Sequence, residues 1–361
     1  MQLYEDRRAL HRIAELGMDL PQTTAYVTQA LADCGCRVFH PIKSAVCGFF
    51  DFGADSAIAF RADMDGLPMT EKTGLPFASR QEGVMHACGH DGHMAILLEL
   101  ARRLRGKHLR KNILLIFQPG EEAPGGAKPL CETGILEQYR VEAVFGLHLW
   151  PGLEQGAIYS RSGALMSRSS EVTVRVTGKS AHIGKAAQGK DALAACVQFY
   201  SRAVEMERQM DPGVFRLLKF GHMESGTVRN VIAASARLEG SLRTFDDGVF
   251  DAMKNRLYEI AAQVETDTGC AVSIHMSEGY PALCNDEALL EKLQRIVPIR
   301  LLEEPSVTSE DFSFYLHRVP GLFCFLGTGD SPALHTAEFD FDETVLLSGA
   351  ALFETIALEY L

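Results

Sequence analysis

The sequence lacks the long apolar stretches of membrane and exported proteins. No uncharged apolar run approaches the ~20 residues that a membrane-spanning helix requires. The first 22 residues mix acidic, basic and apolar side chains and contain no continuous apolar centre of the kind found in signal peptides. Nothing in this pattern indicates export or membrane insertion. We therefore expect a soluble protein that has no membrane partner.

Positive charge is also in deficit. The chain has 35 Lys and Arg against 47 Asp and Glu, which gives a formal net charge of -12. A protein with this balance repels phosphate backbones and anionic membrane surfaces. Nucleic acid is therefore not an expected partner.

The cysteines show no regular spacing. There are nine of them, an odd number, scattered through the whole chain. Free thiols in a reducing compartment fit this distribution better than a disulfide framework does, so we expect a cytoplasmic protein. Cys34 and Cys36 are separated by one residue instead of two, and no thioredoxin-like context follows, so we do not interpret them as a redox pair.

A length of 361 residues suits two domains, and hydrophobic periodicity indicates where they lie. Helical and strand patterns alternate in residues 1–167, as in α/β proteins. The predicted strands are Ser56–Phe60, Asn112–Phe117 and Ala143–Leu149, and the predicted helices include 3–16, 23–34 and 90–105. Each of these strands is followed by, or ends in, a polar motif. Because ligands of open α/β sheets bind beyond the carboxyl ends of the strands, we expect a site there.

A different unit is predicted for residues 168–280. Its patterns follow the order β-α-β-β-α-β, which is typical of an inserted ferredoxin-like domain. The predicted elements are strand 171–176, helix 191–206, strands 215–223 and 235–244, helix 249–266 and strand 271–276. The α/β style then returns with helix 287–297, strand 322–327 and a final helix 343–361. Residues 1–167 and 281–361 are therefore expected to form one discontinuous catalytic domain.

The densest functional motif is His86-Ala-Cys-Gly-His-Asp-Gly-His93. A thiolate and an imidazole two residues apart, Cys88 and His90, can converge on one metal ion, and Gly89 allows the chain to bend closely around it. Chance proximity of Cys and His near a helix start would hardly explain this density. His93 falls inside the predicted helix, and we interpret it as structural.

Two further features supply metal ligands and a base. Glu121 and Glu122 follow a predicted buried strand, where one carboxylate can hold an ion while its neighbour takes a proton from the attacking water. His148 and His335 are single histidines after apolar strands, and either alone would be a core histidine. Together with Cys88, His90 and Glu122 they make five candidate ligands, of types that suit zinc, manganese or cobalt. Five is too many for one catalytic zinc with an open position, but fits two ions that share a bridge.

At this level of detail the sequence resembles a known family. The motifs on which this resemblance depends occur in the same order as in the family and cover essentially the whole chain. They are Phe60-Arg-Ala-Asp-Met-Asp-Gly-Leu-Pro68, the His86–His93 block, Gln118-Pro-Gly-Glu-Glu122, His148-Leu-Trp-Pro151, Arg243-Thr244 and Leu334-His335. They are similar to those of metal-dependent aminoacylases and carboxypeptidases. The match is to the amidohydrolase branch, which includes hippurate hydrolases, N-acetyldiaminopimelate deacetylases and indoleacetyl-amino-acid hydrolases.

The resemblance implies a role for individual residues. It implies two divalent ions per subunit, with Glu121 as general base and Asp65 supporting the site from behind its ligands. The implied ligands are Cys88, His90, Glu122, His148 and His335, and Cys88 would bridge the ions. In the inserted domain it implies oxyanion stabilisation by His182 and substrate binding by Asn230 and Arg243. It also implies a homodimer through the inserted domain, with His182 completing the partner's site.

The sequence departs from the family at two places. Many relatives carry a Pro-His pair after the position of His182, where this chain has Ile183–Gly189. Gly120 stands where alanine is common, a change that we expect only to loosen backbone packing. Asn230 as a turn residue and Arg243 as part of a surface ion pair are alternatives that the sequence leaves open.

The expected activity is hydrolysis of the amide bond of a small N-acyl amino acid, such as an acetyl or benzoyl derivative. Three alternatives remain at this stage. The same site could cleave small dipeptides, Cys88 could act as the nucleophile of a metal-free thiol hydrolase with His90 as its activator, or the protein could bind metal or ligand without catalysis. Chelator sensitivity and turnover distinguish the last two from a metal-dependent deacylase.

Overall fold

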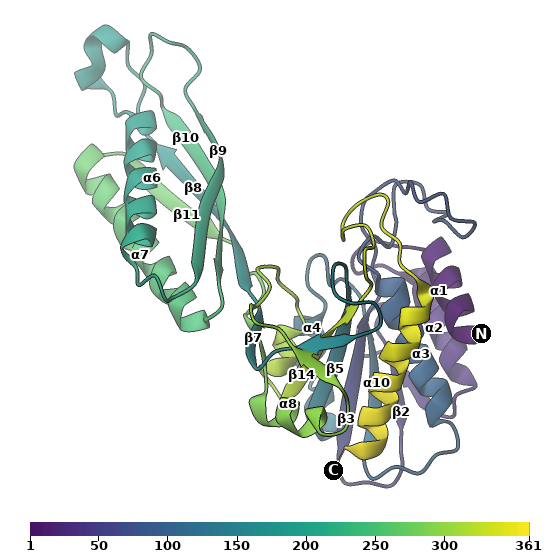
Figure 1. Cartoon of the computed structure of the whole chain (residues 1–361). Helices are drawn as coiled ribbons and strands as arrows, with labels where there is room; N and C mark the ends of the chain where they lie inside the picture. The colour runs from purple at the N-terminus through teal and green to yellow at the C-terminus, as the bar shows by residue number, and fades with distance from the viewer. Residues whose placement is uncertain (361) are drawn as a thin grey trace. The chain divides into compact units, whose positions relative to one another are not determined.

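The computed structural model describes residues 1–360, which fall into two compact units (Figure 1). The first consists of residues 1–165, 284–305 and 310–360, and the second of residues 166–283 and 306–309. The boundaries lie within a few residues of those expected from the sequence, but the short segment 306–309 was not expected to belong to the second unit. No helix among residues 1–360 is long and apolar enough to cross a membrane.

A mixed eight-stranded sheet forms the centre of the first unit. In spatial order its strands are β1 (Arg37–Phe39), β2 (Val46–Phe50), β4 (Asn112–Gln118), β3 (Ala57–Asp63), β5 (Val141–Trp150), β14 (Gly321–Gly327), β6 (Ile158–Ser160) and β13 (Ile299–Leu301). The central strands β4, β3, β5 and β14 are parallel. β3, β4 and β14 are buried at every position, which explains their nearly continuous apolar sequences.

Helices cover this sheet. They are α1 (Gln2–Arg12), α2 (Pro21–Ala32), α3 (His90–Leu104), α4 (Ala127–Glu132), α5 (Ile135–Gln138), α8 (Glu287–Gln294), α9 (Ser313–Leu316) and α10 (Leu346–Glu359). α3 is buried at all but three of its positions because α1 and α10 pack against it as well as the sheet. A short helix η2 (Glu343–Val345) precedes α10, and β7 (Gly163–Met166) pairs with β12 (Leu283–Asn285). The α/β class predicted for this part of the chain is confirmed.

The second unit contains a four-stranded antiparallel sheet with two helices. Its strands lie in the order β11 (Ala271–Met276), β8 (Arg168–Thr177), β10 (Ser235–Thr244) and β9 (Arg216–Ser225). Along the chain the elements follow as β8, η1 (Ile183–Gln188), α6 (Ala192–Gln209), β9, β10, α7 (Asp247–Thr268) and β11. Apart from the short η1, this is the expected succession. Alternate residues of β8 face the helices, with Val172, Val174 and Val176 at most 1% exposed.

The ends of the two long helices follow familiar rules of capping. The Asp191 carboxylate accepts a hydrogen bond from the Ala194 N–H at the start of α6, and the Asp246 carboxylate does the same for the Val249 N–H of α7. Gly269 ends α7 with φ of 68°, a conformation that favours glycine.

Candidate metal centre

The candidate ligands lie at the carboxyl ends of the central strands of the first unit and at the start of α3. His148 is on β5, and Glu122 follows β4. Cys88 precedes α3 and His90 is its first residue, with Gly89 between them at φ of 88°. A Cβ at Gly89 would lie 2.9 Å from a methyl carbon of Leu149. Glycine therefore allows both the turn and its close packing against β5.

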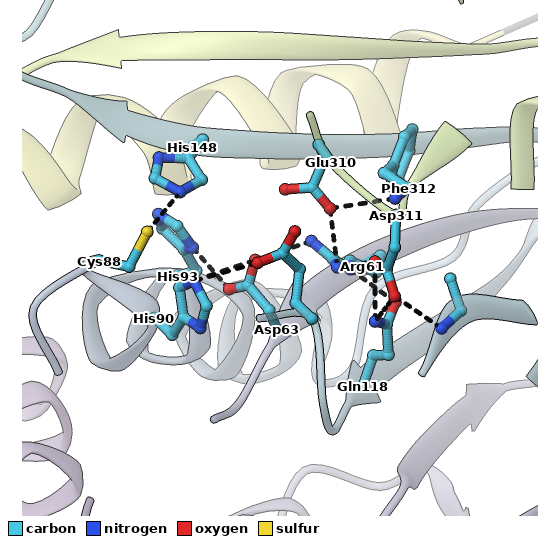
Figure 2. A network of polar contacts seen from close by, with 12 residues as sticks. Arg61, Asp63, Cys88, His90, His93, Gln118, His148, Glu310, Asp311 and Phe312 are labelled. Carbon is cyan, nitrogen blue, oxygen red and sulfur yellow. Dashed lines mark hydrogen bonds and ion pairs between the residues drawn. The ribbon is translucent and has the colours of Figure 1, made fainter. Parts of the chain in front are cut away.

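Two sets of candidate ligands share the Cys88 thiol. One set is Cys88, His90 and His148, and the other is Cys88, Glu122 and His335; within each set the ligand atoms lie within 4.8 Å of one another. The Cys88 Sγ atom lies 3.3 Å from His148 Nε2 and 3.2 Å from His335 Nε2. The first set is visible in Figure 2, where the Cys88 sulfur points toward His148. The fold thus brings together all five predicted ligands.

The histidines present the correct nitrogen toward this centre. His90 donates its Nδ1–H to the Asp65 carbonyl at 2.8 Å, and His148 donates its Nδ1–H to the Leu149 carbonyl at 2.7 Å. Each Nε2 therefore carries a lone pair, as a metal ligand requires. His90 Nε2 is buried and has no hydrogen-bond partner among the described residues. A buried polar atom without a partner is costly, so a cation at this position would satisfy the site.

His335 reaches the centre from a loop with an unusual backbone. Its φ is 60°, in the left-handed region that non-glycine residues seldom adopt. The His335 N–H donates to the carbonyl of Ala87, directly before Cys88, at 2.8 Å. Its Nε2 lies 3.1 Å from Glu122 Oε1. The strained backbone is thus held where the imidazole meets the thiol and the carboxylate.

Asp65 holds the backbone of the carboxylate pair Glu121 and Glu122 in place. Its side chain accepts hydrogen bonds from the backbone N–H groups of Glu121 at 2.9 Å and Glu122 at 3.1 Å, while its carbonyl orients His90. Gly120, just before the pair, has φ of 69°, and a Cβ there would lie 2.5 Å from the Met18 sulfur. The expectation that Gly120 only loosens packing was therefore wrong, because this backbone conformation needs glycine.

Negative charge accumulates at this centre. Burial raises the pKa of Glu121, and the neighbouring carboxylates Glu310 and Glu122 raise it further. Burial, Glu122 and Glu121 likewise raise the pKa of the Cys88 thiol. Divalent cations would reverse both effects by stabilising the thiolate and the carboxylates. The electrostatics therefore fit a cation site.

A buried network next to the centre was not predicted from the sequence. The Arg61 guanidinium, 1% exposed, contacts Asp63 at 2.8 Å, Glu310 at 3.0 Å and Asp311 at 2.7 Å (Figure 2). Its Nε atom also donates to Gln118 at 2.9 Å. Burial raises the pKa of Glu310 to about 8, against the opposing effect of Arg61. The signal that could have indicated this network is the pair of charged residues Arg61 and Asp63 at the end of the otherwise apolar strand β3.

His93 lies close to the candidate ligands, but both of its ring nitrogens already have hydrogen-bond partners within the protein. Its Nδ1–H donates to Asp63 at 2.6 Å, and its Nε2 accepts the Leu149 N–H at 3.0 Å. Its ring packs edge-on against His148, with centroids 4.6 Å apart. Both nitrogens are used, so His93 has no lone pair for a metal. It fixes β5 beside the ligand His148, in agreement with its interpretation as structural.

The three residues predicted in the second unit do not form one cluster. His182 and Asn230 are exposed and lie close together, since the Ile183 N–H donates to the Asn230 carbonyl at 3.0 Å. Arg243 pairs with Ser169 near the other end of β8 and β10 and donates to the Val307 carbonyl at 2.6 Å. Eight residues of β10, roughly 27 Å of strand, separate Ser235 from Arg243. Asn230 and Arg243 of one chain therefore cannot hold the same small carboxylate.

Comparison with known proteins shows the family. Residues 59–359 match the model of peptidase family M20/M25/M40. The chain is 35% identical to the N-acetyldiaminopimelate deacetylase of Shouchella clausii over 97% of this chain and 96% of that protein. It is 35% identical to the N-acetyl-L-cysteine deacetylase of Bacillus subtilis, over 97% of this chain and 86% of that protein. A solved dinuclear metal-binding peptidase of family M20 from Bacillus subtilis superposes with a TM-score of 0.86 at 29% identity, covering 99% of this chain and 96% of that one.

These matches identify the class. The chain belongs to peptidase family M20/M25/M40 and is a metal-dependent hydrolase. The predicted resemblance to metal-dependent aminoacylases and carboxypeptidases is confirmed at the level of the family.

Proposed function

We propose that the protein is a deacylase that hydrolyses the amide bond of small N-acyl amino acids with the help of two divalent cations. The observation that carries this proposal is the Cys88 thiol shared between two sets of ligand atoms, with the Glu121 carboxylate beside them. His90, Glu121 and Glu122 form a further group whose atoms lie within 4.8 Å of one another. The relatives named as deacetylases of N-acetyldiaminopimelate and N-acetyl-L-cysteine support the substrate class.

The five ligands fit a dinuclear centre. Cys88, His90 and His148 would hold one ion, and Cys88, Glu122 and His335 the other. This mixture of sulfur, nitrogen and carboxylate donors suits zinc, manganese or cobalt. When bound, the two cations would lower the pKa of water toward ~7 and polarise the substrate carbonyl.

In this proposal Glu121 moves the proton. Its carboxylate accepts a proton from the attacking water and delivers it to the amide nitrogen, because an amide anion is too poor a leaving group to depart unaided. Asp65 holds the Glu121 backbone in place during both transfers. Arg243 would bind the carboxylate of the amino acid, a task that suits a guanidinium group.

The metal-free alternative, with Cys88 as the nucleophile, has little support. A thiol hydrolase needs a thiolate, whereas burial and two neighbouring carboxylates raise the pKa of the Cys88 thiol. His90 is not placed to activate it, because its Nδ1–H is committed to the Asp65 carbonyl and its Nε2 makes no hydrogen bond to the thiol. A small-dipeptide hydrolase remains the second candidate, since the M20 neighbour is described as a peptidase and the chemistry at the amide is the same.

We also propose that the second unit is a ferredoxin-like lid that forms a homodimer. Leu193, Val197 and Tyr200 follow one another at helical spacing on α6 and are 40–46% exposed, an apolar stripe that a partner could cover. Because His182 and Asn230 lie far from Arg243 along the sheet, one substrate could contact all three only if they came from two chains. In the dimer, His182 would stabilise the oxyanion at the partner's site.

The substrate proposal can be tested with the purified protein. Metal analysis should find two divalent ions per chain, and acetyl-, benzoyl- and indoleacetyl-amino acids should be hydrolysed by a reaction that a chelator stops and the metal restores. A panel of dipeptides measured alongside separates the second candidate. If dipeptides have the higher kcat/KM, the deacylase proposal is wrong, and activity that survives complete metal removal would contradict the metal-dependent reaction itself.

A further inference from the structure

The loop that carries Glu121 and Glu122 is fixed at both ends by one buried carboxylate, that of Asp311. The loop spans residues 119–126, between Gln118 at the end of β4 and Ala127 at the start of α4. Asp311 accepts hydrogen bonds from the Gln118 side-chain amide at 2.7 and 2.9 Å and from the Ala127 backbone N–H at 2.9 Å. Figure 2 shows Asp311 between Gln118 and Arg61. Both ends of the loop are therefore connected to the same side chain.

Arg61 in turn holds the Asp311 carboxylate. The guanidinium Nη2 donates to Asp311 Oδ1 at 2.7 Å, and Arg61 Nε donates to the side-chain oxygen Oε1 of Gln118 at 2.9 Å. Asp311 is 0% exposed and is surrounded by three donors, so neither oxygen can rotate away to water. A carboxylate held in this way defines the positions of the groups that donate to it.

The middle of the loop has a second carboxylate anchor, since Asp65 binds the N–H groups of Glu121 and Glu122. The loop backbone is also tightly packed between these two carboxylates. A Cβ at Gly126 would lie 1.8 Å from the Pro119 carbonyl oxygen, so the two ends of the loop are in direct contact. Carboxylate oxygens of Glu121, Glu310 and Asp311 lie within 4.8 Å of one another. The geometry places the Asp311 anchor directly beside the base.

We infer that Asp311 is a positioning residue for Glu121, with Arg61 and Gln118 as its supports. Its hydrogen bonds go to Arg61, Gln118 and Ala127, none of which is a candidate ligand, and it acts by setting where the loop places the Glu121 carboxylate. Because proton transfer requires hydrogen-bond reach, a displacement of about 1 Å costs roughly 10²-fold in rate. This inference rests on the proposed function for its kinetic consequence, but not for its structural one.

The test is the variant Asp311→Asn, which keeps the shape but turns an amide NH₂ toward groups that are all donors. We expect kcat to fall at least tenfold, KM to change less than twofold and both metal ions to remain bound. Hydrogen–deuterium exchange of the loop amides should be faster, while that of β3 and β4 stays as in the unmodified protein. The matched control is Asp55→Asn, the same change at an exposed position before β3, which should alter none of these quantities.

A milder variant covers the case in which Asp311→Asn fails to fold. Gln118→Met removes one end of the connection and should give the same pattern with a smaller change in kcat and exchange. Unchanged loop exchange or unchanged kcat in a folded variant would overturn the positioning role, as would a loss of metal in proportion to the loss of activity. If the unmodified protein hydrolyses no N-acyl amino acid, the proposed function fails, and the exchange measurement alone still decides the role of Asp311.

Discussion

The two units differ in how far their predicted functional residues are buried. Those of the first unit are buried or half-buried, except His335, which is exposed. In the first, Cys88, His90 and Glu121 are at most 6% exposed, and the carbonyl and carboxylate of Asp65 fix the last two through His90 Nδ1 and the Glu121 N–H. In the second, His182 and Asn230 are exposed, and Arg243 lies near the other end of the same sheet. Burial with specific partners marks a metal centre whose candidate ligands all come from one chain. Exposed and half-buried residues divided between two ends of a sheet do not form one cluster within this chain.

The largest effect is expected from Cys88 in the first unit. Cys88→Ala removes the atom that both ligand sets share, so metal content and activity should fall together to near background. The measurement is metal stoichiometry by mass spectrometry beside kcat/KM. Cys324→Ala, a change at another buried thiol, should keep both ions. Full metal occupancy in Cys88→Ala would show that Cys88 is not a ligand.

Glu121→Gln should separate proton transfer from metal binding. It keeps the size of the side chain and the backbone hydrogen bond to Asp65, so two ions should stay bound while kcat falls by ~10²–10⁴-fold. Steady-state kinetics with metal analysis on the same sample is the required measurement. Turnover close to that of the unmodified enzyme would rule out Glu121 as the base.

In the second unit, the effect of replacing His182 should depend on the other chain of the proposed dimer. His182→Ala should lower kcat by ~10²–10³-fold, as expected for the loss of one oxyanion donor, without loss of metal. When this inactive variant is unfolded and refolded together with Glu121→Gln, a mixed dimer should regain one site, with Glu121 from one chain and His182 from the other. Mixed dimers that form without activity would mean that His182 acts within its own chain or not at all.

The smallest effect concerns the stability of the first unit at alkaline pH. Burial lowers the pKa of the His11 imidazole, but Asp91 and Glu71, which lie 2.9 and 3.3 Å from its nitrogens, raise it to about 9. The folded value exceeds the ordinary 6.5, so this stabilisation is complete below pH 6.5 and disappears as the pH rises through 9.

The midpoint of thermal unfolding should therefore fall between pH 6.5 and 9.5 more steeply in the unmodified protein than in His11→Gln. His40→Gln, which changes a histidine on the same unit without these carboxylate partners, is the control. Parallel pH curves for the unmodified protein and His11→Gln would show that His11 carries no such charge.

Sequence patterns predicted the elements whose own residues carry a clear signal, which is either an uninterrupted apolar run or a helical spacing of apolar residues. The strands β3, β4, β5 and β14 were predicted from their nearly continuous apolar runs, and the helices α3, α6 and α7 from apolar residues at helical spacing. β2, with the sequence Val-Cys-Gly-Phe-Phe, was missed because a short apolar run interrupted by glycine is weak evidence for a strand, although it pairs with β4 along its full length.

At the candidate site, too, residues in local motifs were predicted and residues that depend on distant partners were not. The five candidate ligands stand in motifs that can be read locally, so the sequence indicated them before the fold brought them together. Asp311 and Glu310 could not be found this way, because an acidic pair before a short helix is more often a solvated turn. Their partner Arg61 is 250 residues from Asp311 along the chain, and only the sheet brings them together.

The most direct test of the dinuclear centre is titration of the metal-free protein with cobalt(II), followed by the thiolate-to-cobalt charge-transfer absorption. If Cys88 is shared by two ions, this absorption should grow until two cobalt ions are bound per chain and should be absent in Cys88→Ser. Saturation at one cobalt ion per chain, or the same absorption in Cys88→Ser, would contradict a thiolate shared between two cations.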